Sequence, residues 1–262
     1  MNKSSINIID SFKKSIESTV KAIAKDANIS LIFGQKASPE KYNINLPDIS
    51  EKNYFSDKTI VRGEGDSASL IKRFHNKETH KAMKPGNVES EKIFNKIEFL
   101  RCELIGSAQL PGVKKNLLKI DQLNIKNALN KNENLSKDET FKLILKNYIS
   151  NERLPEDFFT ISDPIIKPLT KILKEKKVNF QKHITNQKKF SKFALDLIKL
   201  VNDETKKSEK EDEVNSDDED KQNELEKKKQ ESNEESIQQF TTETIDQFEE
   251  DKQFDSSSTP DN

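Results

Sequence analysis

Apolar residues recur every three or four positions over most of residues 1–202, which is the spacing of amphipathic α-helices. A first helix is predicted around an apolar stripe that runs from Ile9 to Ile23. Five later stripes predict further helices, which begin near Asp66, near Glu89 (ending at Ile105), at Val113, at Phe141 after a capping-box pattern at Ser136 and Glu139, and at Phe190. The chain is therefore expected to be mainly helical.

Residues 29–33 and 42–46 follow a different pattern, in which apolar and polar positions alternate. Alternation over four or five residues is typical of short strands, and the gap between the two segments contains Gly34 and Pro39. One small β-hairpin is expected. The predicted fold class is thus mainly α, a helical domain with a small β-hairpin near the N-terminus, followed by a disordered acidic tail.

Charge is distributed unevenly along the chain. The net charge is -1, but residues 203–262 contain 22 acidic and 8 basic residues, whereas residues 1–202 contain 24 acidic and 37 basic residues. The tail has too few apolar residues to offset the entropy of ordering its backbone. Two regions are expected: a helical domain over 1–202 and a disordered acidic linker over 203–262.

Composition also indicates where the protein acts. The first ten residues lack the apolar run of a secretory signal, and no stretch of about 18 apolar residues occurs. The single cysteine, Cys102, has no partner for an intrachain disulfide, which fits a reducing compartment. A soluble, cytoplasmic protein without a membrane partner is expected.

Two of the three histidines, His75 and His80, are five residues apart. On one regular helix that step separates the side chains by about 140°, so joint chelation of a metal ion is not expected. His75 shares a helix face with Ile71 and is predicted to be partly buried and hydrogen-bonded, and His80 could pair with Glu78 or with a neighbouring subunit. No metal site is predicted, and the two histidines are kept only as candidate ligands.

The order of polar residues and glycines between positions 62 and 117 adds a more specific observation. The pieces are "RGEGD", "SLIKRFHNKETH", a proline, "KIFNKIEFLRCELIG" and "LPGVKKNL". The series resembles the N-terminal region of the CobT-type subunit of the aerobic, ATP-dependent cobaltochelatase. The matching positions are Arg62, Gly63 and Asp66; His75 and His80; Glu98, Arg101, Glu103 and Gly106; and Gly112, Val113, Asn116 and Leu117.

Residues 12–34 also resemble the first helix and strand of that family, so the resemblance extends from residue 10 to about 202. The acidic tail matches the family's linker in position and character. Family members continue into a von Willebrand factor A domain, and this sequence is expected to lack it because it ends within the linker. Metal-dependent docking through that domain is therefore not expected here.

What the resemblance implies is a subunit of a machine that inserts cobalt(II) into hydrogenobyrinic acid a,c-diamide during cobalamin biosynthesis. The implied partners are an AAA+ subunit of CobS type, in an oligomeric ring, and a large corrin-binding subunit of CobN type. ATP, magnesium and cobalt(II) are used by the complex, and no cofactor is expected on this chain. The motif G-x-x-x-x-G-K-[ST] is missing from the sequence, so ATP hydrolysis is expected on a partner and this chain alone is expected to be non-catalytic.

The motif residues also have a structural interpretation. Glu98 and Arg101 are three residues apart and predict a local ion pair, which Glu103 could extend or direct back towards Arg62. Gly106 and Gly112 are expected to end and begin helices. Arg62, Asp66, His75, Glu98, Arg101 and Glu103 are together predicted to form a polar network that serves folding, subunit contact or both.

Two other classes of function stay open at this point. The basic body and acidic tail also fit a polyanion-binding or chaperone-like protein, although nucleic acid is the less favoured partner. A metal hydrolase that uses His75 and His80 is the least favoured class, because no third ligand lies at a suitable spacing.

Overall fold

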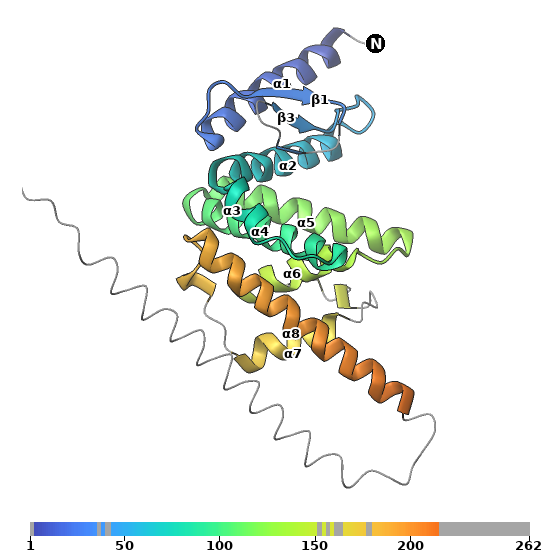
Figure 1. The fold of residues 1–262 in the computed structure, drawn as a ribbon. Coiled ribbons are helices and arrows are strands. Elements are labelled where there is room, and N and C mark those ends of the chain that lie inside the picture. The colour runs from blue at the N-terminus through green and yellow to red at the C-terminus, as the bar shows by residue number, and fades with distance from the viewer. Residues whose placement is uncertain are drawn as a thin grey trace, which may run out of the picture. The chain divides into compact units, whose positions relative to one another are not determined.

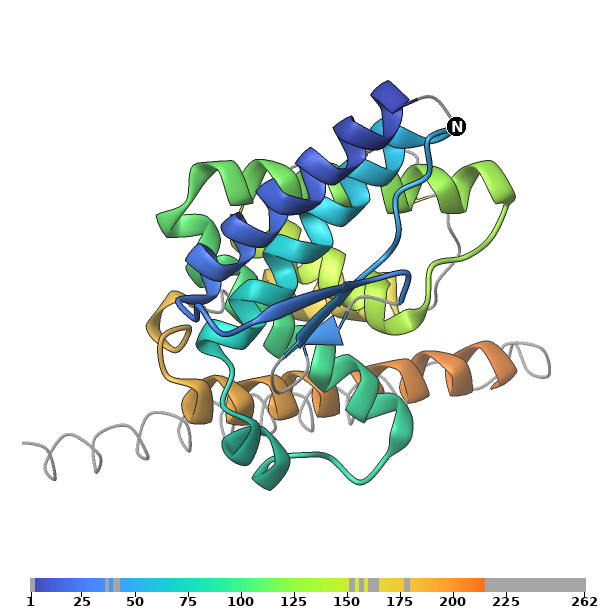
Figure 2. The same cartoon turned by 90° about the horizontal axis from the view of Figure 1, so that it is seen from above.

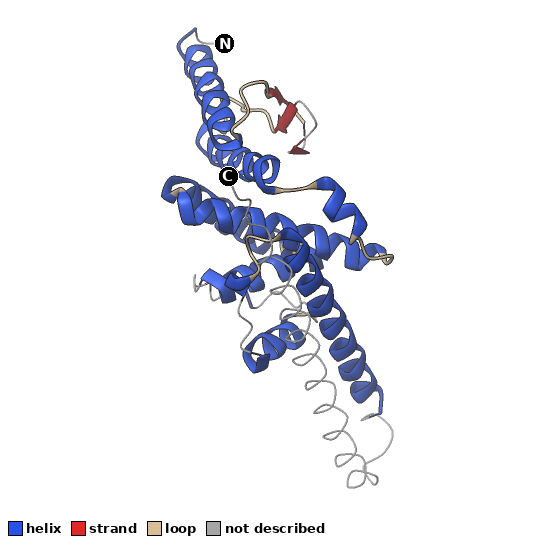
Figure 3. Ribbon diagram, turned by 60° about the vertical axis from the view of Figure 1, so that its left-hand side comes forward, coloured by secondary structure: helices blue, strands red, loops and turns tan. Residues whose placement is uncertain are grey.

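The computed structural model describes residues 3–35, 38–39, 43–150, 154–155, 158–159, 165–176 and 180–214. Contacts between residues divide the chain into two units, Met1–Lys206 and Lys207–Asn262. The helices are α1 (Lys3–Ala24), α2 (Tyr54–Phe74), α3 (Lys77–Ala82), α4 (Val88–Gln109), α5 (Pro111–Lys131), α6 (Lys137–Ser150), α7 (Ile166–Lys176) and α8 (Gln187–Val214). The predicted mainly helical class is confirmed, as Figure 3 shows.

Local sequence explains several helix ends. The Asn87 side chain accepts hydrogen bonds from the backbone N–H groups of Glu89 and Ser90, and so begins α4. Asn76 caps α3 in the same way through Thr79. Helix α5 ends at Asn132, which adopts a left-handed conformation with φ of 52°. Asparagine thus marks three of the helix boundaries in this part of the chain.

The two predicted strands form, but the predicted hairpin between them is wrong. Strand β1 (Ser30–Phe33) pairs in parallel with β3 (Asn43–Leu46), and the sheet order is β1-β3-β2. The hairpin prediction overlooked β2 (Ser38–Pro39), which runs antiparallel to β3 on its other side. The chain reverses its direction at β2 and again before β3, so β3 runs in the same direction as β1. Gly34, with φ of 92°, makes the turn after β1, and Tyr42 lies outside the described residues.

Helix α2 begins at Tyr54, twelve residues before the predicted start near Asp66. The "RGEGD" segment is therefore helical. The apolar periodicity did not indicate this helical segment, because Gly63 and Gly65 contribute no apolar side chain and glycine disfavours helix. Both glycines are buried and lie where α2 packs against its neighbours.

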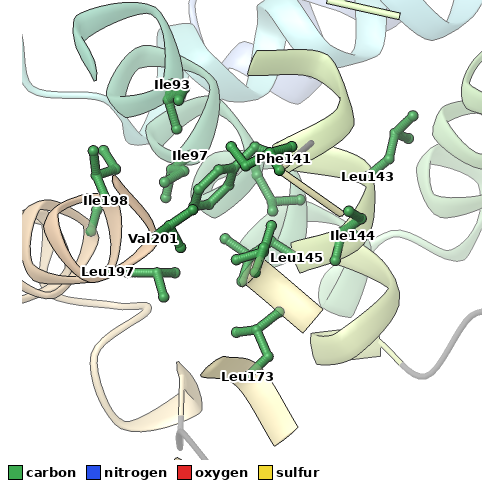
Figure 4. Close-up of a cluster of buried hydrophobic side chains, with 14 of the residues drawn as sticks. Ile93, Ile97, Phe141, Leu143, Ile144, Leu145, Leu173, Leu197, Ile198 and Val201 are labelled. Atoms are coloured by element: carbon green, nitrogen blue, oxygen red, sulfur yellow. The ribbon is translucent and has the colours of Figure 1, made fainter. Parts of the chain in front are cut away.

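The helices of the first unit pack in sequence. Helix α1 packs on α2, α2 packs on α4 and α5, α4 packs on α6, and α6 packs on α7, as Figures 1 and 2 show. The sheet lies beside α1 and α2. One apolar cluster joins α1, the sheet and α2 around Ile16, Val20 and Ile44. A second, larger cluster joins α4, α6, α7 and α8, with Ile97, Phe141 and Leu197 among its members (Figure 4).

Helix α8 begins three residues before the predicted stripe at Phe190 and continues past residue 202 to Val214. The remainder of the predicted acidic linker, residues 215–262, lies outside the described residues. Within the described part of the chain, none of the helices combines the length and the apolar character that a membrane span requires.

Candidate functional site

Arg101 is the centre of a buried polar cluster that joins α2, α4 and α8. Its side chain is 2% exposed, and its guanidinium forms a two-point contact with the carboxylate of Glu98, with distances of 2.8 Å (Nε to Oε2) and 2.7 Å (Nη2 to Oε1). The same group donates to the carbonyl oxygens of Phe74, at 2.8 Å, and Ile184, at 3.1 Å. We call Arg101, Glu98, His75 and Gln187 the hub. The predicted ion pair forms. In addition, Arg101 holds the backbone at Phe74 and at Ile184, both of which lie outside α4.

Charge is held in the hub in spite of its burial. Burial disfavours the ionised form of Glu98, but hydrogen bonds from Arg101 and His75 outweigh it and lower the pKa of this carboxyl. Burial likewise opposes the charge on Arg101, yet Glu98 raises the pKa of the guanidinium further. A charged pair with its hydrogen bonds satisfied is the form in which a protein interior tolerates ions.

His75 lies at the C-terminal end of α2 and bonds Glu98 through Nδ1, 3.0 Å from Oε1. Because a carboxylate only accepts hydrogen bonds, Nδ1 carries the proton in this contact. The expected partly buried, hydrogen-bonded histidine is therefore present, with 10% of its side chain exposed.

Gln187, the first residue of α8, belongs to the hub and was not predicted from the sequence. Its Oε1 accepts from the backbone N–H of Asn76 at 2.7 Å, and its Nε2 donates to the carbonyl of Asn76 at 2.9 Å. The side-chain amide thus bonds both backbone groups of Asn76, as a neighbouring strand would, and connects α8 to the junction between α2 and α3. A single glutamine in a lysine-rich segment, "TNQKKF", gave no pattern by which to find it.

His80 does not lie on the helix that carries His75, so the angular argument against joint chelation does not apply. Helix α2 ends at Phe74 and α3 begins at Lys77, which brings the two imidazole rings to a centroid distance of 4.8 Å. His80 stacks on Phe94 and its Nε2 lies 2.7 Å from Oδ1 of Asn95, rather than pairing with Glu78. Burial lowers the pKa of His80, so a neutral ring is favoured.

Asp66 and Asn116 bring two of the sequence motifs together. Nδ2 of Asn116 on α5 donates to Oδ2 of Asp66 on α2 at 2.7 Å. Asp66 is 1% exposed, and burial raises the pKa of its carboxyl to about 6, although Asn116 and Arg62 oppose the shift. Arg62, one turn earlier, lies 5.6 Å from the centroid of the Phe12 ring and so faces α1.

Glu103 does not extend the hub towards Arg62. Its carboxylate accepts from Ser67 on α2 at 2.7 Å and from Lys142 on α6 at 3.2 Å. Nearby, Lys146 contacts Asp121 on α5 at 2.5 Å. Burial disfavours both charges, yet the lysines lower the pKa of Glu103, whereas burial keeps the pKa of Asp121 above its ordinary value.

This second cluster, of Glu103, Asp121, Lys142 and Lys146, was not predicted. Lys142 and Lys146 are 8% and 7% exposed and replace apolar residues on the inner face of α6. Lysine is almost never buried unless it is paired, so nothing in the sequence indicated that these two are buried. The expected single network of six residues is in fact two clusters and a separate contact between Asp66 and Asn116.

Gly106 does not end a helix, which corrects the prediction. It lies within α4, and a Cβ atom at this position would come within 2.9 Å of Cγ of Leu70 on α2. Gly63 has the same role between α2 and α5, since a Cβ there would lie 2.9 Å from Cβ of Ile120. Gly112 does begin α5, as its second residue. Val113 and Leu117 bury their side chains on the same helix.

The described residues offer little space or ligand chemistry near the motifs. No group of three or more His, Cys, Asp or Glu among them is arranged to hold a metal ion. The cavity beside Asp121 and Lys146 measures about 20 Å³, enough for about one water molecule. An open hollow of about 570 Å³ on α7 is lined by Phe159, Lys167 and Lys174 among others, and by no motif residue.

Fold and site together define a mainly helical protein whose distinctive polar residues join its own helices. The chain belongs to the CobT family, because the family model described as cobalamin biosynthesis protein CobT matches residues 7–262. This family implies a role in cobalamin biosynthesis as part of cobaltochelatase, and hence partner subunits. No solved structure matches the chain.

Proposed function

We propose that this protein is a non-catalytic assembly and coupling subunit of cobaltochelatase, which supports ATP-driven insertion of cobalt(II) into hydrogenobyrinic acid a,c-diamide. The observation that carries this proposal is the use of the motif residues. Arg101, Glu98 and Asp66 are each at most 2% exposed and are hydrogen-bonded to other helices. Side chains so enclosed hold helices against one another, which supports a structural rather than a catalytic role.

The proposal assigns the chemistry to partners. An AAA+ subunit of CobS type would hydrolyse ATP with magnesium in an oligomeric ring, and a large subunit of CobN type would bind the corrin and the cobalt(II) substrate. The chain would contribute a rigid helical body that transmits the motion of the ring. A hub that fixes α2, α4 and α8 against one another suits this role, since a flexible body would absorb the motion.

The test is reconstitution of the complete chain with its cognate AAA+ subunit, ATP and magnesium. A large assembly is expected by analytical ultracentrifugation, and it should persist at about 0.15 M salt, because contacts through packed helices are screened less than exposed charges. Cobalt insertion is not expected from this assembly in the absence of the large subunit.

An Arg101→Met variant sharpens this experiment. Removal of the guanidinium leaves Glu98 buried without its partner, so the variant should lose assembly together with stability. Lys92→Met, at an exposed position of the same helix, is the matched control and should assemble normally. Indifference of the AAA+ subunit to the wild-type chain, with retention of RNA at about 0.15 M salt, would replace this proposal by polyanion binding.

A further inference from the structure

Helix α5 presents an exposed face with positive charge and without carboxylates. Every exposed position between residues 114 and 131 is Lys, Asn or Gln. The one acidic residue of the helix, Asp121, points inward, where it contacts Lys146 and Lys142. Its negative charge therefore interacts with the buried lysines and does not neutralise the lysines on the exposed face of α5.

Three lysines form a straight row on that face. Lys115, Lys119 and Lys126 are separated by four and by seven residues, steps that return to the same side of a helix, and the row is about 16 Å long. None of the three has an acidic partner among the residues that the structure describes. We call these three residues the lysine row. Half-buried Leu118 and Leu123 flank it on either side.

Two other described helices, α1 and α8, carry carboxylates beside their lysines. On α1, Lys21 pairs with Glu17 at 2.8 Å. On α8, Lys188, Lys192 and Lys199 have the same spacing as the lysine row, but exposed Asp196 lies between the second and third of them. An uninterrupted basic row thus distinguishes α5 from α1 and α8.

We propose that the lysine row is a docking site for an acidic amphipathic helix of another protein. A second helix has the same rise per residue, so carboxylates at i, i+4 and i+11 can face the three ammonium groups in register. The flanking leucines supply apolar contact, and the asparagines and glutamine supply hydrogen bonds at the rim. Nucleic acid fits less well, because lysine contacts a phosphate as a point charge without the two-point geometry of arginine, and α5 contains no aromatic residue on which bases could stack. The inference does not depend on the proposed function.

The probe is a synthetic helical peptide with blocked ends, glutamates at i, i+4 and i+11, and leucines on both sides of that row. Binding to the complete chain is measured by fluorescence anisotropy at about 0.05 and 0.15 M salt. A peptide of the same composition, with the glutamates spread around the helix, is the control ligand. The wild-type chain should bind the first peptide about tenfold or more tightly than the second, and less tightly at the higher salt.

Two triple variants locate the site. Lys115→Glu/Lys119→Glu/Lys126→Glu should weaken binding of the first peptide about tenfold or more. Lys188→Glu/Lys192→Glu/Lys199→Glu makes the same change of charge at the same spacing on α8 and should leave binding within about twofold. All six positions are exposed, so circular dichroism and thermal unfolding should show both variants folded.

The remaining outcomes would overturn the inference. Equal losses in the two triple variants would mean that only the total charge of the body matters. Absence of peptide binding by the wild-type chain, or equal binding of both peptides, would exclude a helix-specific site. An oligouridylate that binds more tightly than the peptide, and is lost only in the α5 variant, would make the surface a nucleic-acid site.

Discussion

At the scale of single residues, close helix packing in this protein depends on glycines. Two glycines of the sequence motifs, Gly63 and Gly106, lie within helices at points where another helix leaves no room for a Cβ atom. Glycine in a helix interior costs about 1 kcal/mol relative to alanine, and here that cost is offset by the apolar contacts that the close approach allows.

Gly63→Ala tests this account. The new methyl group would meet Cβ of Ile120 at 2.9 Å and the carbonyl oxygen of Asn116 at 3.2 Å, and both atoms belong to or lie next to the backbone of α5. We expect the free energy of unfolding to fall by about 1–3 kcal/mol in a denaturant titration. Gly112→Ala, where a Cβ meets no atom within 4 Å, is the control and should be neutral or slightly stabilising. Equal effects at the two positions would refute a packing role for Gly63.

Asp66 predicts a dependence of stability on pH. Burial raises the pKa of its carboxyl from 3.8 to about 6, so between these values the folded state binds a proton that the unfolded state has released. Stability from this group is therefore present below about pH 4 and is lost as pH rises through 6. Asp66→Asn keeps an oxygen for Asn116 and has no charge to bury. Relative to wild type, it should gain about 2–3 kcal/mol between pH 4 and pH 8 in unfolding titrations.

The control for Asp66 is Asp10→Asn, since Asp10 is exposed on α1. Its stability relative to wild type should change little over the same range of pH. A difference between Asp66→Asn and wild type that stays constant from pH 4 to pH 8 would show that Asp66 titrates normally.

At the scale of elements, the described helices that were foreseen are those with an uninterrupted apolar stripe. The stripe from Ile9 to Ile23 gave α1, because every third or fourth residue is buried against α2 or the sheet. The start of α2 was missed where glycines interrupt the stripe. Strand β2 was missed because two residues are too few to show alternation, and its presence turned a predicted hairpin into a parallel pair.

The candidate site could be predicted only where partners are close in sequence. Glu98 and Arg101 are three residues apart, so helix geometry alone pairs them. Gln187 lies more than a hundred residues from Asn76, and the lysines of α6 meet carboxylates from two other helices. Such contacts depend on how the helices pack, and the spacing of apolar residues along the chain does not predict which helices meet.

Gln187→Ala tests the tie between α8 and the junction of α2 with α3. The variant removes two hydrogen bonds to the backbone of Asn76, which should lower the free energy of unfolding by about 1–2 kcal/mol. Amide hydrogen exchange at Asn76 should accelerate more than at other amides, since its N–H loses its acceptor. Lys188→Ala, at the exposed neighbouring position, should change neither quantity. Unchanged exchange at Asn76 in Gln187→Ala would show that the tie is not needed.

At the scale of the whole molecule, the apolar clusters and the balance of charge depend on different parts of the chain. The apolar clusters of the first unit are complete by Val201. The balance of charge, in contrast, involves all 262 residues, since a net charge of -1 combines a basic body with an acidic tail. A single truncation should therefore change the net charge of the protein and leave its stability nearly unchanged.

Truncation after Lys206, the end of the first unit, is the experiment that separates them. The fragment retains each buried residue named in the clusters, so its melting temperature should stay within about 2–4 °C of the complete chain. Its net charge rises from -1 to +12, which should increase its affinity for an RNA oligonucleotide and make that affinity fall steeply with salt. Differential scanning calorimetry and filter binding at about 0.05 and 0.2 M salt measure the two effects. A large drop in melting temperature would place part of the stabilising contacts after Lys206, and unchanged RNA binding would mean that the tail does not offset the charge of the body.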